Sequence, residues 1–282
     1  MAFGELGTQA LRAENVDKVV KGFALQKYVI KPLFTIQDSG AWQESYYRES
    51  ATELSATAKV ARLAAFPQQS PLWNKLSAYQ QKHGLEVDVA VEDELADNLP
   101  VIMRSQLRIA RAIAKSVDTA CYTVLSSDAG NTFTIDGGNP NAGFWDAATR
   151  ADRHPLDAIG EAIELVETAN YEPDTLLLNP NDYRLIRTND DVMDAFTPTN
   201  NIASTGVLGQ LVGLNVVVSN SVAADTAFVF ESGVFGTYKQ VVPLTTDVHN
   251  VPGVKKTIRG WEIGVPFITD PSAVCKISNT NA

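Results

Sequence analysis

The clearest pattern in the chain is a long stretch of helical periodicity that follows Pro100. Apolar residues such as Ile109, Ile113 and Val117 recur there every three or four positions and fall on one face. At about 100° of rotation per residue, a basic stripe falls on the opposite face, and proline is favoured in a first helical turn. The pattern predicts one long amphipathic helix over residues 100–126. The basic stripe consists of Arg104, Arg108, Arg111 and Lys115.

Strand-like patterns lie on both sides of this helix. Leu85, Val87 and Val89 alternate with acidic residues, and this period of two is typical of a half-buried strand. A second amphipathic helix is expected to start near Pro155, and a short one over 182–187. The mixture indicates the α+β class, with helices concentrated in the middle. Further β-prone runs predict strands at 175–178, 214–219, 227–231, 241–248, 255–263 and 273–277.

Residues 28–50 are also β-prone, but Pro32 and a polar turn interrupt them. A long polar insert separates these residues from the strand at 85–91. Together the two segments suggest a large two-stranded projection. An isolated two-stranded ribbon is marginally stable in water, so we expect it to lie on a neighbouring copy of the chain. The alternative is that its aromatic residues belong to the subunit's own core. The aromatic residues in question are Phe34, Trp42, Tyr46 and Tyr47.

Composition narrows the class of protein. The 282 residues suffice for one large domain or two modest ones, and 45% hydrophobic with 20% charged residues is ordinary for a globular protein. The net charge of −10 argues against binding nucleic acid through bulk charge, because phosphate affinity comes from Lys and Arg. The N-terminus shows no signal-peptide pattern, and no run approaches the ~20 apolar residues of a membrane span. We therefore expect a soluble protein that is synthesised in a cytoplasm.

The sequence suggests no catalytic, cofactor-binding or metal-binding residues. His83, His154 and His249 have no partner at a metal-ligand spacing, and Cys121 and Cys275 stand far apart. Neither a phosphate-binding glycine loop nor a nucleophile elbow is present. The basic stripe leaves three interpretations open: a solvated face, a docking surface for the acidic residues of a neighbour, or a wall toward nucleic acid.

An ordered series of segments carries a resemblance to the major capsid proteins of tailed bacteriophages, which have the Hong Kong 97-type fold. The resemblance covers nearly all of the chain from about residue 28, and it rests on the order of the segments more than on any one motif. Asn215 stands where the family commonly has proline. The segments are His83–Val87 before the long helix, Phe144–Asp146 with His154–Ile159, Pro173–Tyr183, Leu211–Asn220 and Gly264–Ile268.

The resemblance implies an N-terminal arm, an extended β-hairpin loop, a peripheral domain with a long spine helix, and an axial domain. In this family the spine helix lies against the inner surface, which keeps the basic stripe a candidate for facing packaged DNA. Lys59 lies in the implied loop, but nothing around it identifies a cross-linking site. The implied limits are 1–30 for the arm, 31–84 for the loop, 85–127 plus 246–282 for the peripheral domain, and 128–245 for the axial domain.

The implied function is self-assembly into the icosahedral head that encloses double-stranded DNA, without enzymatic activity. The implied partners are further copies in hexamers and pentamers, scaffolding, portal and decoration proteins, and packaged DNA held by non-specific contacts; no membrane is involved. The location is the virion, after synthesis in the host cytoplasm. The chain is short before its first strand, where some members of the family carry an N-terminal scaffolding region. Either that region is removed by proteolysis, against which Met1 argues, or a separate scaffolding protein acts.

Two alternatives remain open at this stage. An encapsulin-type nanocompartment shell would share the fold but enclose a cargo enzyme instead of a genome. A soluble α+β enzyme with an unrecognised site belongs to a different class, and a stable monomer would favour it.

Overall fold

The structure is a computed structural model of the chain. It describes residues 28–49, 73–96, 99–136, 143–147, 152–189 and 209–281, with shorter pieces at 16, 18–20, 60, 66, 68, 149 and 192. The elements, in chain order, are η1 (Lys31–Leu33), β1 (Thr35–Asp38), β2 (Gln43–Glu49), β3 (Trp73–Tyr79), β4 (Gln81–Ala90), α3 (Val91–Leu95), α4 (Leu99–Asp128), β5 (Asn131–Thr134), α5 (Pro155–Thr168), β6 (Thr175–Leu178), α6 (Pro180–Arg187), β7 (Gln210–Leu211), β8 (Leu214–Val218), β9 (Thr226–Phe230), β10 (Gly236–Val251), β11 (Lys255–Ile268), η4 (Pro271–Ala273) and β12 (Val274–Ser278).

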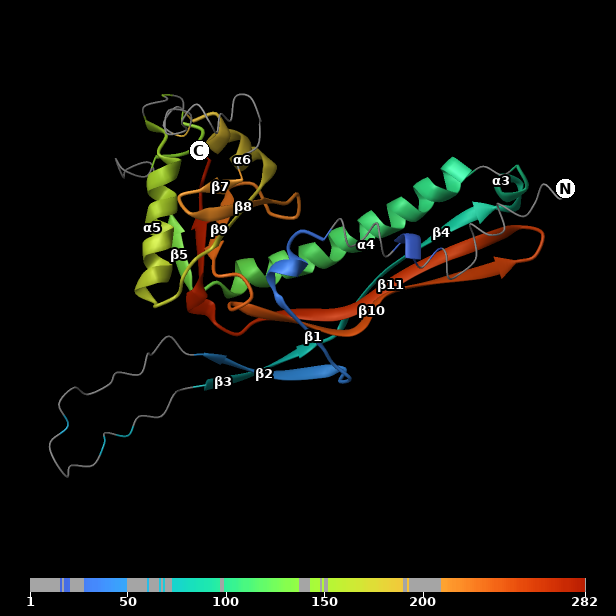
Figure 1. Cartoon of the computed structure of the whole chain (residues 1–282), viewed down its shortest axis with the longest axis horizontal. Helices are drawn as coiled ribbons and strands as arrows, with labels where there is room; N and C mark the ends of the chain where they lie inside the picture. The colour runs from blue at the N-terminus through green and yellow to red at the C-terminus, as the bar shows by residue number, and fades with distance from the viewer. Residues whose placement is uncertain are drawn as a thin grey trace.

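A four-stranded sheet and the long helix α4 form the elongated part of the molecule (Figure 1). The strand order is β1-β10-β11-β4, with β1 parallel to β10 and the other neighbours antiparallel. Helix α4 packs on β11 and β4, with Ile109 and Ile113 buried. A Cβ atom at Gly260 of β11 would lie 2.9 Å from both Ile109 Cγ2 and Ile113 Cδ1. Glycine at this position therefore allows the helix to approach the sheet closely.

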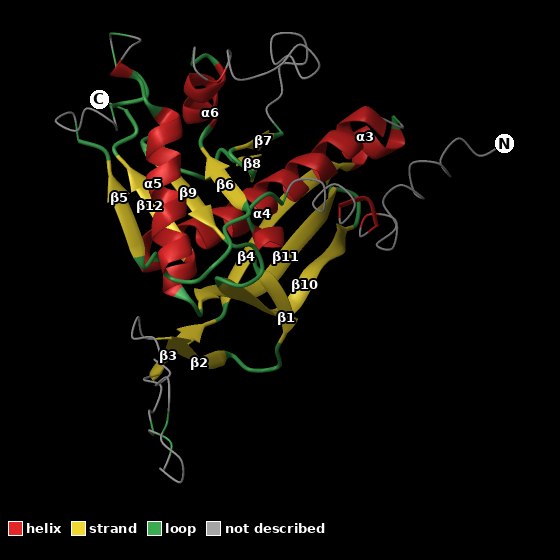
Figure 2. Cartoon of the chain, turned by 60° about the vertical axis from the view of Figure 1, so that its left-hand side comes forward, coloured by secondary structure: helices red, strands yellow, loops and turns green. Residues whose placement is uncertain are grey.

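A second sheet has six strands in the order β5-β12-β9-β6-β8-β7, and apolar side chains pack against both of its faces. Leu177 and Phe228 point toward one side and share a core with α4, whereas Leu178 and Val229 point to the other and share a core with α5. Figure 2 shows α5 lying along this sheet beside β5, β12 and β9. A strand that is buried on both faces has a nearly continuous run of apolar residues. This explains the run of three leucines, Leu176–Leu178, in β6.

Two proline-containing segments start the helices that flank the six-stranded sheet. Pro155 and Pro180 each stand at the beginning of a helix, where a missing N–H has no consequence because that group has no intrahelical partner. Asn179 caps α6, since its side-chain oxygen accepts a hydrogen bond from the Asn181 backbone N–H at 2.9 Å. The Asn-Pro-Asn sequence therefore fixes the point where strand β6 ends and α6 begins.

Strands β2 and β3 form a separate antiparallel hairpin below the two larger sheets (Figures 1 and 2). Gln43 pairs with Tyr79 at one end and Glu49 with Trp73 at the other. The described part of the hairpin is therefore seven residues long on each strand.

The prediction of a long helix is confirmed by α4, and the strands expected from 175 onward correspond to β6 and β8–β12. The expected pairing within the projection is wrong. Strand β4 pairs with β11, β1 pairs with β10, and the projection is made by β2 and β3. The physical reason is that the apolar side of β4 needs a cover, which α4 provides and a lone ribbon would not.

Two strands lie in a different sheet from the one that the expected domain limits imply. Strand β10 begins at Gly236, inside the range expected for the axial domain, yet it belongs to the four-stranded sheet. Strand β12 falls in the range expected for the peripheral domain, yet it pairs with β5 and β9 in the six-stranded sheet. The domain limits themselves stay a prediction, and most of the expected arm lies outside the described residues.

Candidate assembly surfaces

The β2–β3 hairpin holds one of its faces against its own subunit. Tyr46 stacks on Phe267 of β11, with the ring centroids 4.2 Å apart. Arg48 forms an ion pair with Asp128 at the end of α4. Because side chains alternate along a strand, Tyr46 and Arg48 lie on the same face. This inner face attaches the base of the hairpin to both α4 and β11.

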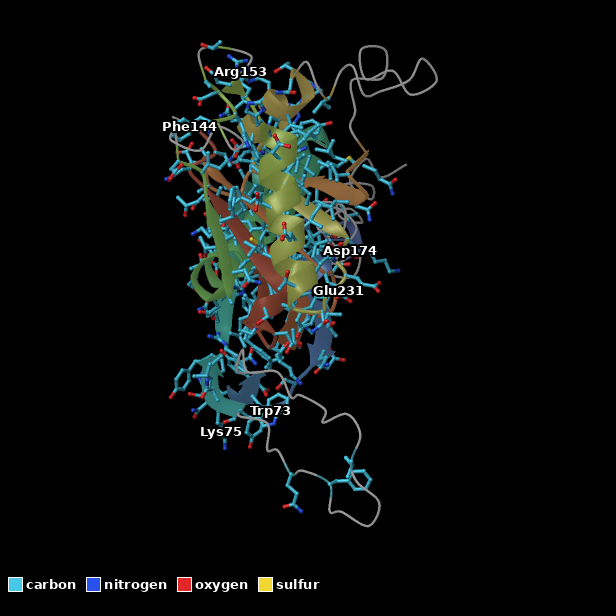
Figure 3. The ribbon with its side chains drawn as sticks, turned by 90° about the vertical axis from the view of Figure 1, so that its left-hand side faces the viewer. Trp73, Lys75, Phe144, Arg153, Asp174 and Glu231 are labelled. Carbon is cyan, nitrogen blue, oxygen red and sulfur yellow. The ribbon has the colours of Figure 1, made fainter. Side chains whose placement is uncertain are left out.

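The outer face of the hairpin carries exposed aromatic side chains. The strand register places Tyr47 opposite Lys75, with Tyr79 and Trp73 farther along the same face. Tyr47, Trp73 and Tyr79 are 57%, 48% and 60% exposed. Figure 3 shows Trp73 and Lys75 on the hairpin, below the main body of the molecule. A cluster of large exposed apolar groups on a projection is typical of a protein–protein contact surface.

The four aromatic residues expected at a subunit contact divide into two groups. Phe34 is 3% exposed and packs edge-on against Phe235 at 4.6 Å; its assignment to the contact is wrong, because it lies in the core of its own subunit. Tyr46 stacks within its own chain. Trp42, which is 61% exposed, and Tyr47 have their side chains open to a partner, and for them the expectation stays a prediction.

Trp73 and Tyr79 are the aromatic residues that the sequence analysis missed. They stand six positions apart in one strand, and an even spacing places both on the same face. That spacing is the signal that would have identified them, although their partner strand cannot be read from local sequence.

The basic stripe of α4 lies on the side of the helix that faces away from the sheets. Arg104, Arg108, Arg111 and Lys115 are exposed, whereas Ile109, Ile113 and Val117 on the other side are buried. None of the four cations forms an ion pair within the part of the chain that the structure describes. The stripe is therefore available to a partner, and its contact with DNA stays a prediction.

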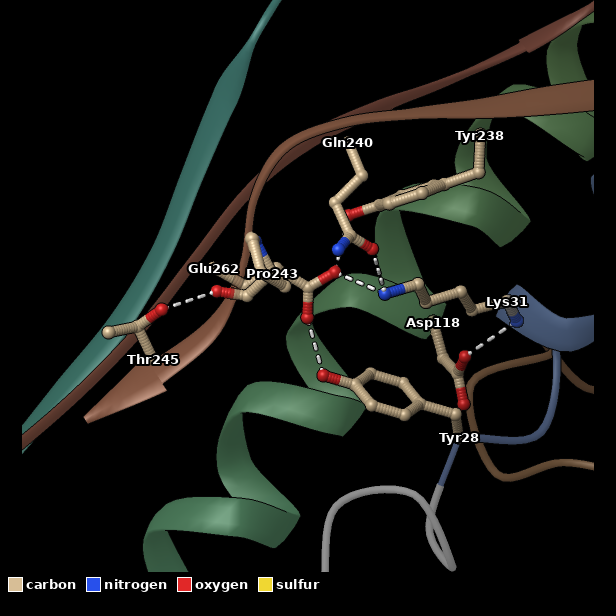
Figure 4. A network of polar contacts seen from close by, with 8 residues as sticks. All are labelled: Tyr28, Lys31, Asp118, Tyr238, Gln240, Pro243, Thr245 and Glu262. Atoms are coloured by element: carbon tan, nitrogen blue, oxygen red, sulfur yellow. Dashed lines mark hydrogen bonds and ion pairs between the residues drawn. The ribbon is translucent and has the colours of Figure 1, made fainter. Parts of the chain in front are cut away.

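A buried polar network fixes the segment that leads into the first strand (Figure 4). Glu262 of β11 is fully buried and accepts hydrogen bonds from Tyr28 Oη at 2.5 Å and Tyr238 Oη at 3.0 Å. Lys31 Nζ pairs with the same carboxylate at 2.5 Å and donates to Gln240 at 2.9 Å. Burial and the nearby Glu262 raise the pKa of both tyrosines, so their hydroxyls remain donors.

A second carboxylate, that of Asp118 on α4, holds the backbone of the same segment. It accepts the N–H groups of Val29, Ile30 and Lys31 at 2.9, 3.1 and 3.0 Å. Desolvation raises the pKa of Asp118, while these hydrogen bonds oppose the rise. The two carboxylates together fix residues 28–31 to α4 and to β11.

The described residues offer little chemistry of other kinds. They contain no group of three or more His, Cys, Asp or Glu side chains that would hold a metal ion. Burial raises the pKa of the Cys275 thiol to about 11 and that of Cys121 well above its usual value, and such thiols are poor nucleophiles. Burial lowers the pKa of His83, whose Nδ1 lies 2.8 Å from Ser116 Oγ. Within the described ranges, no helix has the length and apolarity of a membrane span.

Several solved structures share the fold of this chain at low sequence identity. The capsid of cyanophage P-SCSP1u matches with a TM-score of 0.68 and 14% identity, covering 90% of this chain and 89% of that one. A virus-like particle from Pyrococcus furiosus matches with a TM-score of 0.65 and 11% identity, covering 94% and 98%. A structure from Mycobacterium phage Che8 has a TM-score of 0.60 and 16% identity, covering 86% of each chain. The architecture is therefore the Hong Kong 97-type fold.

Sequence comparison gives the family. No curated protein sequence matches the chain significantly. The model of a phage capsid protein family, however, matches residues 74–277, from strand β3 to the end of β12. This match covers well over half of the chain and agrees with the fold, so the chain belongs to the phage capsid protein family and is a major capsid protein, a structural subunit of an icosahedral shell.

Proposed function

We propose that this chain forms the head of a tailed phage around double-stranded DNA, and that the β2–β3 hairpin connects neighbouring subunits. The observation that carries the proposal is the difference between the two faces of the hairpin. The inner face is fixed to its own subunit by Tyr46 and Arg48, whereas the outer face exposes Tyr47, Trp73 and Tyr79. A projection that is held on its inner face and exposes aromatic side chains among polar ones on its outer face is suited to lie on the next copy.

The exposed aromatic area sets the scale of this contact. An aromatic side chain has about 150–250 Å² to bury, and Tyr47, Trp73 and Tyr79 are each about half exposed. Each would remove roughly 100 Å² more from water, which is about 2.5 kcal/mol at 25 cal/mol per Å². Closed symmetry repeats the contact around the shell, so a modest contact between two copies stabilises the whole.

The implied partners follow from the same function. Further copies in hexamers and pentamers form the shell, and scaffolding, portal and decoration proteins act with it in the virion. The chain has 33 acidic and 23 basic residues, so DNA would be contained non-specifically by the wall rather than bound tightly. Synthesis takes place in the host cytoplasm.

The assembly role is tested with the double variant Tyr47→Ala/Trp73→Ala. We expect circular dichroism and melting of the subunit to remain near wild type, because both side chains are about half exposed, and the yield of shells in sucrose gradients to fall at least roughly tenfold. Val234→Ala, at an apolar position that is 39% exposed outside the hairpin, is the matched control. Wild-type yields of normal shells from the double variant would refute the role of the hairpin.

The contents of the shell distinguish a phage head from a nanocompartment. We retain the nanocompartment as the alternative because a virus-like particle from Pyrococcus furiosus matches over 94% of this chain. The chain is expressed with the genes encoded beside it, and purified particles are treated with nuclease. Protected double-stranded DNA supports the head. A protected enzyme with no nucleic acid supports the nanocompartment.

A further inference from the structure

Helix α5 carries an acidic ridge that no residue of its own helix neutralises. Asp157, Glu161, Glu164 and Glu167 are exposed, and the helix contains no Lys or Arg between Pro155 and Thr168. Like charges three or four positions apart destabilise a helix. His154 lies near one end of the ridge, with its Nδ1 3.7 Å from Asp157 Oδ2, but nothing comparable faces Glu161 or Glu164 among the described residues.

The basic stripe of α4 has the same construction with the opposite sign. Residues 104–115 contain four cations and no acid, and Asp118 is turned to the buried side, where it holds the backbone of residues 29–31. Each helix therefore presents a ridge of one charge to solvent.

The spacings of the two ridges match. Asp157, Glu161 and Glu164 follow one another at four and three residues, as do Arg104, Arg108 and Arg111. At about 100° per residue, each triplet lies within an arc of about 60°, and at 1.5 Å per residue each spans about 10 Å. Two helices placed side by side would bring three acids opposite three cations.

The two ridges do not meet within one subunit. Phe228 and Leu177 on one face of the six-stranded sheet share a core with α4, whereas Val229 and Leu178 on the opposite face share a core with α5. The sheet therefore separates the helices. Figure 3 shows α5 facing outward at one end of the molecule, with Asp174 and Glu231 beside it. The acidic ridge thus faces away from the body of its own subunit.

We infer that the acidic ridge of α5 in one subunit docks on the basic stripe of α4 in the next copy of the chain. The inference rests on the proposed shell function and specifies a contact between neighbours in a ring. A contact between two different patches of identical chains is heterologous, and it closes into a ring when the rotation permits. Complementary charge fixes the register of such a contact and disfavours wrong pairings.

A second copy fits the stripe better than DNA does. The shell wall has a net charge of −10 per subunit, which repels a polyanion on average. The spacing of the basic stripe matches that of the acidic ridge on α5, which has no cation opposite Glu161 or Glu164 among the described residues. Both surfaces belong to the protein whose copies form the shell. DNA contact is therefore an outcome of the test rather than a second proposal.

Charge reversal tests the docking. The acidic variant is Glu161→Lys/Glu164→Lys, the basic variant is Arg104→Glu/Arg108→Glu, and a third protein combines all four changes. We expect each double variant to lower the yield of capsomers and shells at least roughly tenfold and the combined protein to recover most of it. Asp136→Lys/Asp152→Lys, at exposed acids outside α5, is the matched control and should assemble normally.

If a charge-reversed variant fails to fold, a cross-linking measurement tests the docking of α5 on α4 instead. Arg108→Cys and Glu161→Cys are joined by a short bismaleimide in the assembled wild-type background, where Cys121 and Cys275 are buried. We expect a ladder of covalent multimers when both new cysteines are present and none when either is absent.

The outcomes are distinguishable from failure of the proposed function. Shells that form normally from both reversed variants, without a cross-linked ladder, would overturn the docking and leave the capsid role intact. Normal shells with loss of packaged DNA in the basic variant alone would assign the stripe to DNA instead. Absence of any assembly by the wild-type chain, alone or with its neighbouring genes, would contradict the shell function itself.

Discussion

Replacing Lys31 by methionine tests the buried network that holds residues 28–31 against α4 and β11. Lys31 Nζ lies 2.5 Å from Glu262 Oε1, and the carboxylate is fully buried. Methionine keeps most of the volume of the lysine stem but removes its charge. The carboxylate would then be left with the hydroxyls of Tyr28 and Tyr238 and without a cation.

The expected magnitude follows from the burial. Breaking a buried ion pair by removing one partner costs about 3–5 kcal/mol. We expect about 3 kcal/mol for Lys31→Met, at the lower end, because the two tyrosine hydroxyls still donate to Glu262. The double variant Lys31→Met/Glu262→Gln removes both charges, and we expect it to lie within about 1 kcal/mol of wild type, since neutral replacement of a buried pair is often nearly neutral.

The assay is urea denaturation of unassembled subunits, followed by circular dichroism, on wild type, both single variants and the double variant. The coupling free energy from this cycle should be at least about 2 kcal/mol. A cost below about 1 kcal/mol for Lys31→Met, or single-variant costs that simply add in the double variant, would refute the argument that this pair fixes residues 28–31 to the core.

Two further predictions address packing and pH. Gly260→Ala places a Cβ 2.9 Å from Ile109 Cγ2 and Ile113 Cδ1, so we expect a loss of about 1–3 kcal/mol in the free energy of unfolding. The control Gly40→Ala, where no atom lies within 4 Å of the added Cβ, should leave that free energy nearly unchanged. Equal effects at the two sites in urea denaturation would contradict close helix–sheet packing. Burial raises the pKa of Asp182 from 3.8 to about 6, so the native state binds this proton more tightly than the unfolded chain and the group's contribution to stability falls as pH rises from about 4 to 6. Asp182→Asn should therefore gain in stability relative to wild type between about pH 4.5 and 7.5, and a difference that stays constant across this range in thermal melts would refute the pKa shift.

The amphipathic helix and the buried strands could be predicted from the sequence because their signals are local. The stripe of Ile109, Ile113 and Val117 marks α4 without knowledge of what covers it. The apolar run Thr175–Leu178 identifies β6, since both faces of that strand are buried. These patterns arise from burial on a single element and need no knowledge of its partners.

The pairings and contacts between distant segments could not be predicted in this way. Strand β3 shows little alternation because both its faces serve as surfaces, one toward its own subunit and one outward, so its pairing with β2 depends on long-range register. Phe34 looks like an exposed ribbon residue until β1 is placed beside β10. The partners of Glu262, which include Tyr28 more than two hundred positions away, have no signature in either local sequence.

The most direct test of the central claim is electron microscopy of the purified protein, expressed alone and together with its neighbouring genes. We expect closed icosahedral shells or capsomer rings, with the outer face of the β2–β3 hairpin lying on an adjacent subunit in the reconstructed map. A uniform monomer under every condition, or a shell in which Tyr47, Trp73 and Tyr79 face only solvent, would contradict the account.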